Sequence, residues 1–153
     1  MGMKKLRIYI ENSVIGGYFD EEFKEFTQKL FENFKNGKYH PIISSHVKVE
    51  LENGAPTYVK QNLNTINYEE FNVSEEMVEL AEKYMEQRIV SENYYDDALH
   101  IAIATVLGVD VLVSWNFKHI VNLNRIKLFN SVNLREGYNV LEIRSPREVI
   151  ENE

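Results

Sequence analysis

The sequence predicts an α/β fold in which a parallel sheet is covered by helices on both faces. Short runs of apolar residues that suit buried strands alternate along the chain with longer stretches in which apolar residues recur at helical spacing. The strand-like runs are almost continuously apolar, as is typical of strands covered on both faces. We therefore expect the core of the sheet to contain Ile8, Ile10, Ile43, Leu112 and Val113.

Five segments are interpreted as strands because each is a short apolar or extended run. Pro41 lies near the start of the second strand, where the loss of a backbone N–H is tolerated. In chain order, the expected strands cover residues 6–10, 39–44, about 68–73, 109–114 and 139–143.

Helices are expected between the strands, where apolar residues recur every three or four positions. The first covers residues 21–36, carries phenylalanines at that spacing and ends at Gly37, a residue type that commonly terminates helices. Pro146 directly follows Ser145, as is typical of the first position of a helix. The other helices are expected over residues 45–52 and 56–64, from residue 74, from residue 97, and over residues 122–136.

Length and composition limit the class of protein. A chain of 153 residues can bury a core as a single domain, which we expect to span residues 1–153. The hydrophobic content of 44% excludes wholesale disorder, and no 18-residue apolar run that could span a membrane is present. The absence of cysteine excludes disulfides, thiolate zinc sites and a cysteine nucleophile. No signal-peptide pattern is found, so we expect a cytoplasmic location.

The net charge of −7 argues against a dedicated nucleic-acid-binding protein, whose surface is usually basic. It does not exclude a nuclease, because carboxylates that hold divalent cations lower the formal charge while the ions attract phosphate. The composition therefore leaves metal-dependent phosphate chemistry open.

Polar residues at the carboxyl ends of the strands are the candidate functional residues, because sites in parallel α/β folds lie beyond those ends. Glu11 directly follows the first strand, Glu50 lies on the short helix after the second, and Asn116 follows the fourth. Asp97 begins its helix at the same edge of the sheet, because the preceding helix returns the chain there. Oxygen ligands of this kind suit Mg²⁺ or Mn²⁺.

Two of these acids compete with a neighbour for the role of ligand. A carboxylate at the start of a helix accepts hydrogen bonds from free N–H groups, so Asp96 is expected to be an N-cap. Asp97 then needs another partner, for which a metal ion is a candidate. Glu50 is favoured over Glu52, which turns away from the apolar stripe of its helix.

Other side chains near the strand ends have structural interpretations. His100 lies on the same helical face as Asp97 and is expected to be a hydrogen-bonded structural histidine, with orientation of a carboxylate or substrate contact as alternatives. His46 and His119 are interpreted as surface polar residues. Trp115 is expected to pack against the core rather than to stack on a base.

Four short segments carry a resemblance that covers about residues 5–143. They are Tyr-Ile-Glu-Asn-Ser-Val near the start, Ile-Ser-Ser-His-Val-Lys-Val-Glu in the middle, and Asp-Asp-Ala-Leu-His-Ile-Ala-Ile-Ala followed by Leu-Val-Ser-Trp-Asn-Phe-Lys-His-Ile. In this order and spacing they resemble the PIN-domain family, particularly the VapC-like toxins of bacterial and archaeal toxin–antitoxin systems.

The resemblance implies a three-layer α/β/α fold, single-stranded RNA as substrate, and an acidic pocket for one or two Mg²⁺ or Mn²⁺ ions. The family's three acids map onto Glu11, Glu50 and Asp97, which are therefore the expected metal ligands. Its fourth catalytic position, often Asp, maps onto Asn116. The hydroxyl near the first acid maps onto Ser13, which we expect to support the carboxylates together with His100.

Two positions depart from the family pattern. Glu11 is one methylene longer than the usual Asp, and Asn116 offers a carbonyl oxygen without a charge. Three carboxylates can still hold one Mg²⁺, with substrate phosphate completing its coordination. The sequence thus predicts a metal-dependent ribonuclease, with a catalytically weakened RNA- or protein-binding module of the same fold as the alternative. A flavodoxin-like small-molecule binder fits the alternation of elements but lacks a glycine-rich phosphate loop.

The expected partners follow from the same resemblance. An antitoxin protein is a possible partner, and PIN-like toxins are often dimers. We expect a homodimer because the helices carry more aromatic surface than one core needs, with Phe19, Phe23, Tyr94 and Tyr95 among the residues involved.

Overall fold

The computed structural model describes residues 4–153, so the first three residues of the expected domain lie outside the described residues. Its centre is a sheet of five parallel strands in the order β3-β2-β1-β4-β5. The strands are β1 (Leu6–Ile10), β2 (Tyr39–Ser44), β3 (Glu69–Phe71), β4 (Val111–Val113) and β5 (Ile143–Arg144).

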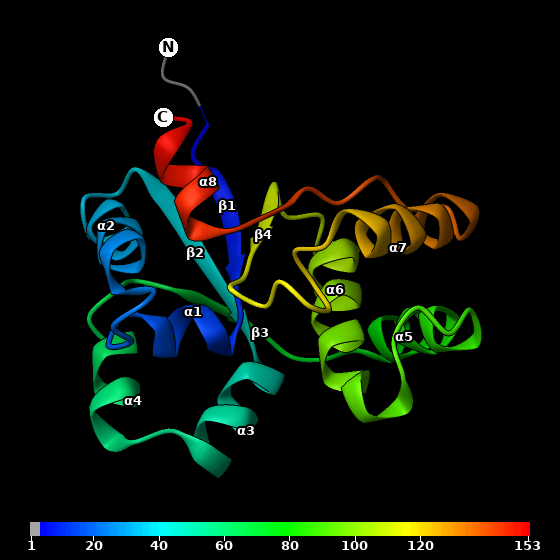
Figure 1. Cartoon of the computed structure of the whole chain (residues 1–153), viewed down its shortest axis with the longest axis horizontal. Helices are drawn as coiled ribbons and strands as arrows, with labels where there is room; N and C mark the ends of the chain where they lie inside the picture. Colours follow the sequence, from blue (N-terminus) through cyan, green and yellow to red (C-terminus); the bar gives the residue numbers. More distant parts are fainter. Residues whose placement is uncertain (1–3) are drawn as a thin grey trace.

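Helices cover both faces of this sheet (Figure 1). One layer contains α1 (Asn12–Gly17), α2 (Lys24–Lys35) and α8 (Pro146–Glu151), and the other contains α5 (Glu75–Glu86), α6 (Tyr95–Leu107) and α7 (Leu123–Arg135). Beyond the carboxyl end of the sheet lie α3 (Ser45–Gly54) and α4 (Thr57–Leu63), while the short 3₁₀ helix η1 (Glu92–Tyr94) precedes α6. The predicted three-layer α/β/α fold with a central parallel sheet is confirmed.

The core of the sheet contains the residues that the sequence predicts. Ile8, Ile10, Ile43, Leu112 and Val113 are all fully buried. In the register of β1 and β4, Ile10 lies beside Val113, so both strands end at the same level. From β1 the chain continues to β2 and β3 on one side of the sheet, and it then crosses to β4 and β5 on the other side of β1. The order of the strands therefore reverses between β1 and β4, and parallel α/β folds place their sites at such a switch.

Two local predictions differ from the structure. The last strand is confined to β5, because the backbone before it is bound by a side chain: Asn130 accepts from the N–H of Leu141 and donates to its carbonyl. Helix α1 was not predicted, because it is only six residues long and contains two glycines. Within residues 4–153, no helix has both the length and the apolar character that a membrane crossing requires.

Trp115 joins α1 and α2 to the end of β4. Its indole stacks on Phe23 with ring centroids 4.4 Å apart, and Nε1 donates to Thr27 Oγ1 at 2.8 Å. The expectation that Trp115 packs against the core is confirmed, since the residue is 7% exposed. The indole also contacts the backbone of Gly17, where a Cβ atom would lie 2.9 Å from Trp115 Cδ1.

This contact generates a stability prediction with a matched control one residue away. Replacing Gly17 by Ala should lower the free energy of unfolding by about 1–3 kcal/mol, because the added methyl displaces a buried indole. The same change at Gly16, where a Cβ would meet nothing within 4 Å, should alter it by less than about 1 kcal/mol. Urea denaturation measures both, and equal stabilities of the two variants would contradict the prediction.

Candidate functional site

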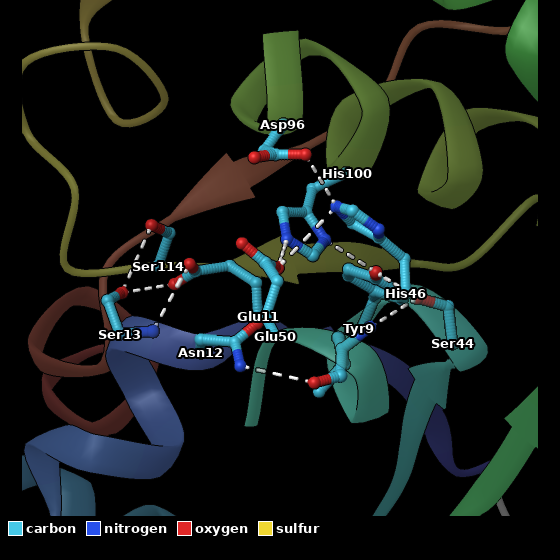
Figure 2. A network of polar contacts seen from close by, with 11 residues as sticks. Tyr9, Glu11, Asn12, Ser13, Ser44, His46, Glu50, Asp96, His100 and Ser114 are labelled. Atoms are coloured by element: carbon cyan, nitrogen blue, oxygen red, sulfur yellow. Dashed lines mark hydrogen bonds and ion pairs between the residues drawn. The ribbon is translucent and has the colours of Figure 1, made fainter. Parts of the chain in front are cut away.

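Glu11 leaves β1 and caps the following helix. Its carboxylate accepts from the N–H of Ser13 at 3.2 Å, and the Ser13 hydroxyl also donates to it. The Ser13 hydroxyl lies 3.5 Å from that of Ser114 and accepts from the N–H of Trp115 at 2.9 Å. Figure 2 shows the contacts of Ser13 with Glu11 and Ser114. Ser13 thereby joins the ends of β1 and β4 and holds the carboxylate between them.

The Glu11 carboxylate is buried at this junction, with only 5% of the residue exposed. Burial raises the pKa of Glu11, and the nearby His100 and the hydrogen bonds from Ser13 oppose the shift. A buried carboxylate with a perturbed pKa at a strand end is a candidate functional group.

Glu50 projects from α3 toward α6. Ser44 caps α3 by accepting from the N–H of Val47 at 3.3 Å, which fixes where the helix begins. Glu50 Oε1 lies 2.6 Å from His100 Nε2. Burial pushes the pKa of Glu50 upward, but the hydrogen bond and charge of His100 and the charge of His46 outweigh it, so the pKa is lowered.

His100 is hydrogen-bonded at both ring nitrogens, as expected of a structural histidine, and is only 2% exposed. Its Nδ1 lies 2.8 Å from Tyr9 Oη, which lies 2.9 Å from Ser44 Oγ. Burial lowers the pKa of His100, but the Glu50 hydrogen bond and the charges of Glu11, Glu50 and Asp97 outweigh it and raise the pKa. Of the three predicted acids, Glu50 therefore bonds this imidazole directly, and the charges of Glu11 and Asp97 also act on it.

Asp97 lies in the first turn of α6 and contacts the loop that follows β4. Its Oδ2 lies 3.1 Å from Nδ1 of His119. Burial raises the pKa of Asp97, and the charges of His119 and His100 together with a hydrogen bond from Asn116 oppose the rise. The Tyr94 ring covers His119, with the two ring centroids 3.8 Å apart.

Asn116 shapes this loop. Its N–H donates to Ser114 Oγ at 2.9 Å, and its side-chain oxygen accepts from the N–H of His119 at 3.0 Å. The amide therefore caps the turn that carries His119 toward Asp97.

The interpretation of His46 and His119 as surface polar residues was wrong. His119 is buried between Asp97 and Tyr94, and the His46 side chain is only 17% exposed. His46 Nε2 lies 2.9 Å from Asp96 Oδ1. Both histidines are covered by residues of η1 and α6, which are distant in the sequence.

The expectation that Asp96 is an N-cap was also wrong. The N-cap of α6 is Tyr94, which makes no side-chain capping bond, because η1 leads directly into the helix. Asp96 instead lies in the first turn and pairs with His46. The four-residue spacing of His46 and Glu50 on a predicted helix was a signal that could have indicated a role for His46.

Three side chains offer possible metal ligands at close range. One ligand atom each from His46, Glu50 and His100 lies within 4.8 Å of the other two. His46 Nε2 is buried and has no hydrogen-bond partner of suitable geometry. Two imidazole nitrogens and a carboxylate oxygen form a donor set that fits a divalent cation. The ligand set predicted from the sequence, Glu11, Glu50 and Asp97, stays a prediction.

Comparisons with known proteins support the fold alone. No family model and no curated protein matches the sequence. The chain is similar to one in the crystal structure of VapBC2 from Rickettsia felis bound to a DNA fragment from its promoter, with a TM-score of 0.57, 19% identity, and coverage of 90% of this chain and 98% of that one. It is also similar to tyrosyl-tRNA synthetase from Archaeoglobus fulgidus complexed with L-tyrosine, with a TM-score of 0.51, 12% identity, and coverage of 93% of this chain and 56% of the synthetase. The first likeness supports a VapC-like, PIN-like fold.

The Tyr9 hydroxyl is predicted to stabilise the site, because its loss leaves His100 Nδ1 buried without a partner. Tyr9→Phe should lower the free energy of unfolding by about 1–3 kcal/mol. Tyr39→Phe is the matched control, since that hydroxyl bonds the terminal residue Glu153 and its loss should cost about 1 kcal/mol or less. Chemical denaturation compares the two, and a larger loss at Tyr39 would contradict the prediction.

Proposed function

We propose that the protein is a metal-dependent endoribonuclease of the VapC-like toxin type that cleaves single-stranded RNA. The observations that carry this proposal are that Glu11 ends β1, Glu50 bonds the buried His100, and Asp97 pairs with His119 in the loop after β4, so that acids from three segments meet the switch in strand order. Acids from three separate segments repel one another where they lie close together; the imidazoles and Ser13 beside them offset this repulsion, and a bound divalent cation would offset it more strongly. A shared cationic ligand gives that arrangement a purpose.

Each residue of the proposed site has a distinct task. Glu11, Glu50 and Asp97 would hold Mg²⁺ or Mn²⁺, and Asn116 would present its amide beside them. When bound, the ion would supply a water of lowered pKa and neutralise charge on a phosphodiester. Ser13 holds the Glu11 carboxylate in place and His100 holds that of Glu50, so neither acid has to be ordered when RNA binds.

The rim of the site offers groups that suit single-stranded RNA. The Tyr94 ring is 38% exposed beside the buried His119, and Lys118 Nζ lies 5.8 Å from the centroid of that ring. An exposed aromatic ring can stack on a base while a neighbouring ammonium attracts phosphate. These two residues supply local attraction in a chain whose net charge is −7.

A binding module with weakened catalysis is the second candidate. Asn116 supports it, because its side-chain oxygen is already engaged by the N–H of His119 and carries no charge. Under this alternative, the protein has the fold and the RNA-binding rim, but Asn116 at the fourth catalytic position only stabilises the turn that carries His119.

We further propose a cytoplasmic protein that pairs with an antitoxin, since the similar chain from Rickettsia felis belongs to a VapBC2 complex. We also propose a homodimer. Among the aromatic residues that suggested one, Phe19 and Tyr94 are exposed at 41% and 38%, whereas Phe23 and Tyr95 are partly buried.

The nuclease proposal is tested by substituting Glu50 and comparing the result with substitution of Glu52, a second acid on α3. Glu50→Gln should abolish metal-dependent cleavage of a single-stranded RNA, as should Asp97→Asn or chelation, because each removes ligand charge or the ion itself. Glu52→Gln is the matched control, since Glu52 is exposed and pairs with Lys60 at 3.5 Å. Cleavage is followed on a labelled oligonucleotide with Mn²⁺ or Mg²⁺.

Two results would contradict the nuclease proposal. One is equal cleavage by the wild type, Glu50→Gln and Asp97→Asn. The other is RNA binding without cleavage at any metal concentration, which supports the binding module.

The assembly proposal is tested separately. Light scattering at micromolar concentration should give the mass of two chains, because an exposed aromatic surface is stabilised by pairing. The mass of a single chain, 18.0 kDa, would contradict it.

A further inference from the structure

We propose that His46, Glu50 and His100 form a site for a first-row transition-metal ion and discriminate against Mg²⁺. Zn²⁺ belongs to this class, and Co²⁺ is the probe for it. This site shares Glu50 with the proposed nuclease centre. A role of the bound ion in RNA cleavage rests on the proposed function, whereas the binding of the ion does not rest on it.

The three ligands come from two helices that meet at the end of the sheet. His46 and Glu50 are four residues apart on α3 and therefore lie on one face of it, and His100 faces them from α6. Glu50 Oε1 lies 2.6 Å from His100 Nε2 and 3.7 Å from His46 Nε2, and the two ring centroids are 5.1 Å apart. Both Nε2 atoms thus approach the same carboxylate oxygen.

The far nitrogen of His100 is held in the way that metal-binding histidines require. Metal-ligating imidazoles usually donate their second N–H to a partner, which fixes the ring and its tautomer. Tyr9 Oη lies 2.8 Å from Nδ1 and can accept from it while donating to Ser44 Oγ at 2.9 Å. In the metal-free protein a proton on Nε2 bonds the Glu50 carboxylate, and a metal ion that binds this nitrogen would replace that proton.

His46 supplies an independent observation. Its Nε2 is buried and has no hydrogen-bond partner of suitable geometry, although Asp96 Oδ1 lies 2.9 Å away. Buried polar groups are almost always satisfied, and this nitrogen, held only by the ion-pair contact with Asp96, also faces a carboxylate and a second imidazole, as a metal ligand would. Asp96 lies on the outer side of the cluster (Figure 2) and provides a further oxygen beside it.

The identity of the donors determines the class of metal. Imidazole nitrogens suit Zn²⁺ and the later first-row ions such as Co²⁺ and Ni²⁺, whereas Mg²⁺ prefers oxygen ligands and retains its waters. Two of the three donors here are nitrogens. In Figure 2, Ser13 and Ser114 lie on one side of Glu11 and His46 lies on the other.

The experiment titrates Co²⁺ into the full-length, metal-stripped protein and follows its visible absorption. We expect bands shifted by nitrogen ligands, and affinity that an excess of Mg²⁺ does not reduce. His46→Gln should weaken Co²⁺ binding by at least about tenfold. His40→Gln is the matched control, because His40 also pairs with a glutamate, Glu69 at 2.8 Å, but on β2 away from this cluster. It should bind Co²⁺ like the wild type.

A second measurement does not depend on any variant. Proton NMR of the Co²⁺-loaded protein should show strongly shifted exchangeable signals from two imidazole N–H groups. The inference is overturned if these signals are absent, if Mg²⁺ displaces Co²⁺ at similar concentrations, or if His46→Gln binds Co²⁺ as His40→Gln does.

The outcomes separate this inference from the proposed nuclease. If Co²⁺ binding depends on His46 but the protein cleaves RNA with none of the metals tested, the result supports the histidine site and contradicts the nuclease proposal. Mg²⁺-supported cleavage that His46→Gln leaves unchanged, together with unchanged Co²⁺ binding, supports the nuclease and overturns the site.

Discussion

The site depends on the two hydrogen bonds of the buried His100. One ring nitrogen contacts Tyr9 on the central strand, and the other contacts Glu50 on α3, while the residue itself belongs to α6. A single imidazole therefore fixes three elements that are far apart in the sequence. Because an unpaired buried nitrogen is costly, the sheet and both helices are held in register by the need to satisfy it.

The same imidazole accounts for the distribution of charge around it. Buried carboxylates are unfavourable unless they are paired or hydrogen-bonded. Glu11 is bound by Ser13, Glu50 by His100, and Asp97 by His119. Every acid of the proposed centre thus has an internal partner, and for two of them that partner is a histidine. A metal-free protein with this arrangement can fold, and a bound ion would compete with imidazoles for the same oxygens.

The sequence predicted the strand ends well and the histidines poorly. The position of Glu11 follows from an apolar run that ends abruptly, and the confirmed core residues follow from the same runs. The Tyr94 ring instead covers His119, and Asp96 pairs with His46, and both partners lie on elements distant from these histidines in the sequence. A local sequence pattern does not indicate which distant residues will contact a histidine. Only the four-residue spacing of His46 and Glu50 on one helix indicated that His46 could belong to the site.

Two of the structures similar to this chain show why the side chains rather than the fold must carry the functional argument. A chain of a VapBC2 complex and part of a tyrosyl-tRNA synthetase both match this sheet and its helices. A parallel sheet with a switch in strand order creates a crevice whatever its chemistry, and unrelated activities share such folds. What distinguishes this crevice is that histidines approach its acids from α3, α6 and the loop after β4. A centre made only of carboxylates needs an ion to relieve their repulsion, whereas here imidazoles already do so. The choice of metal therefore depends on which ion binds these nitrogens better than a proton does.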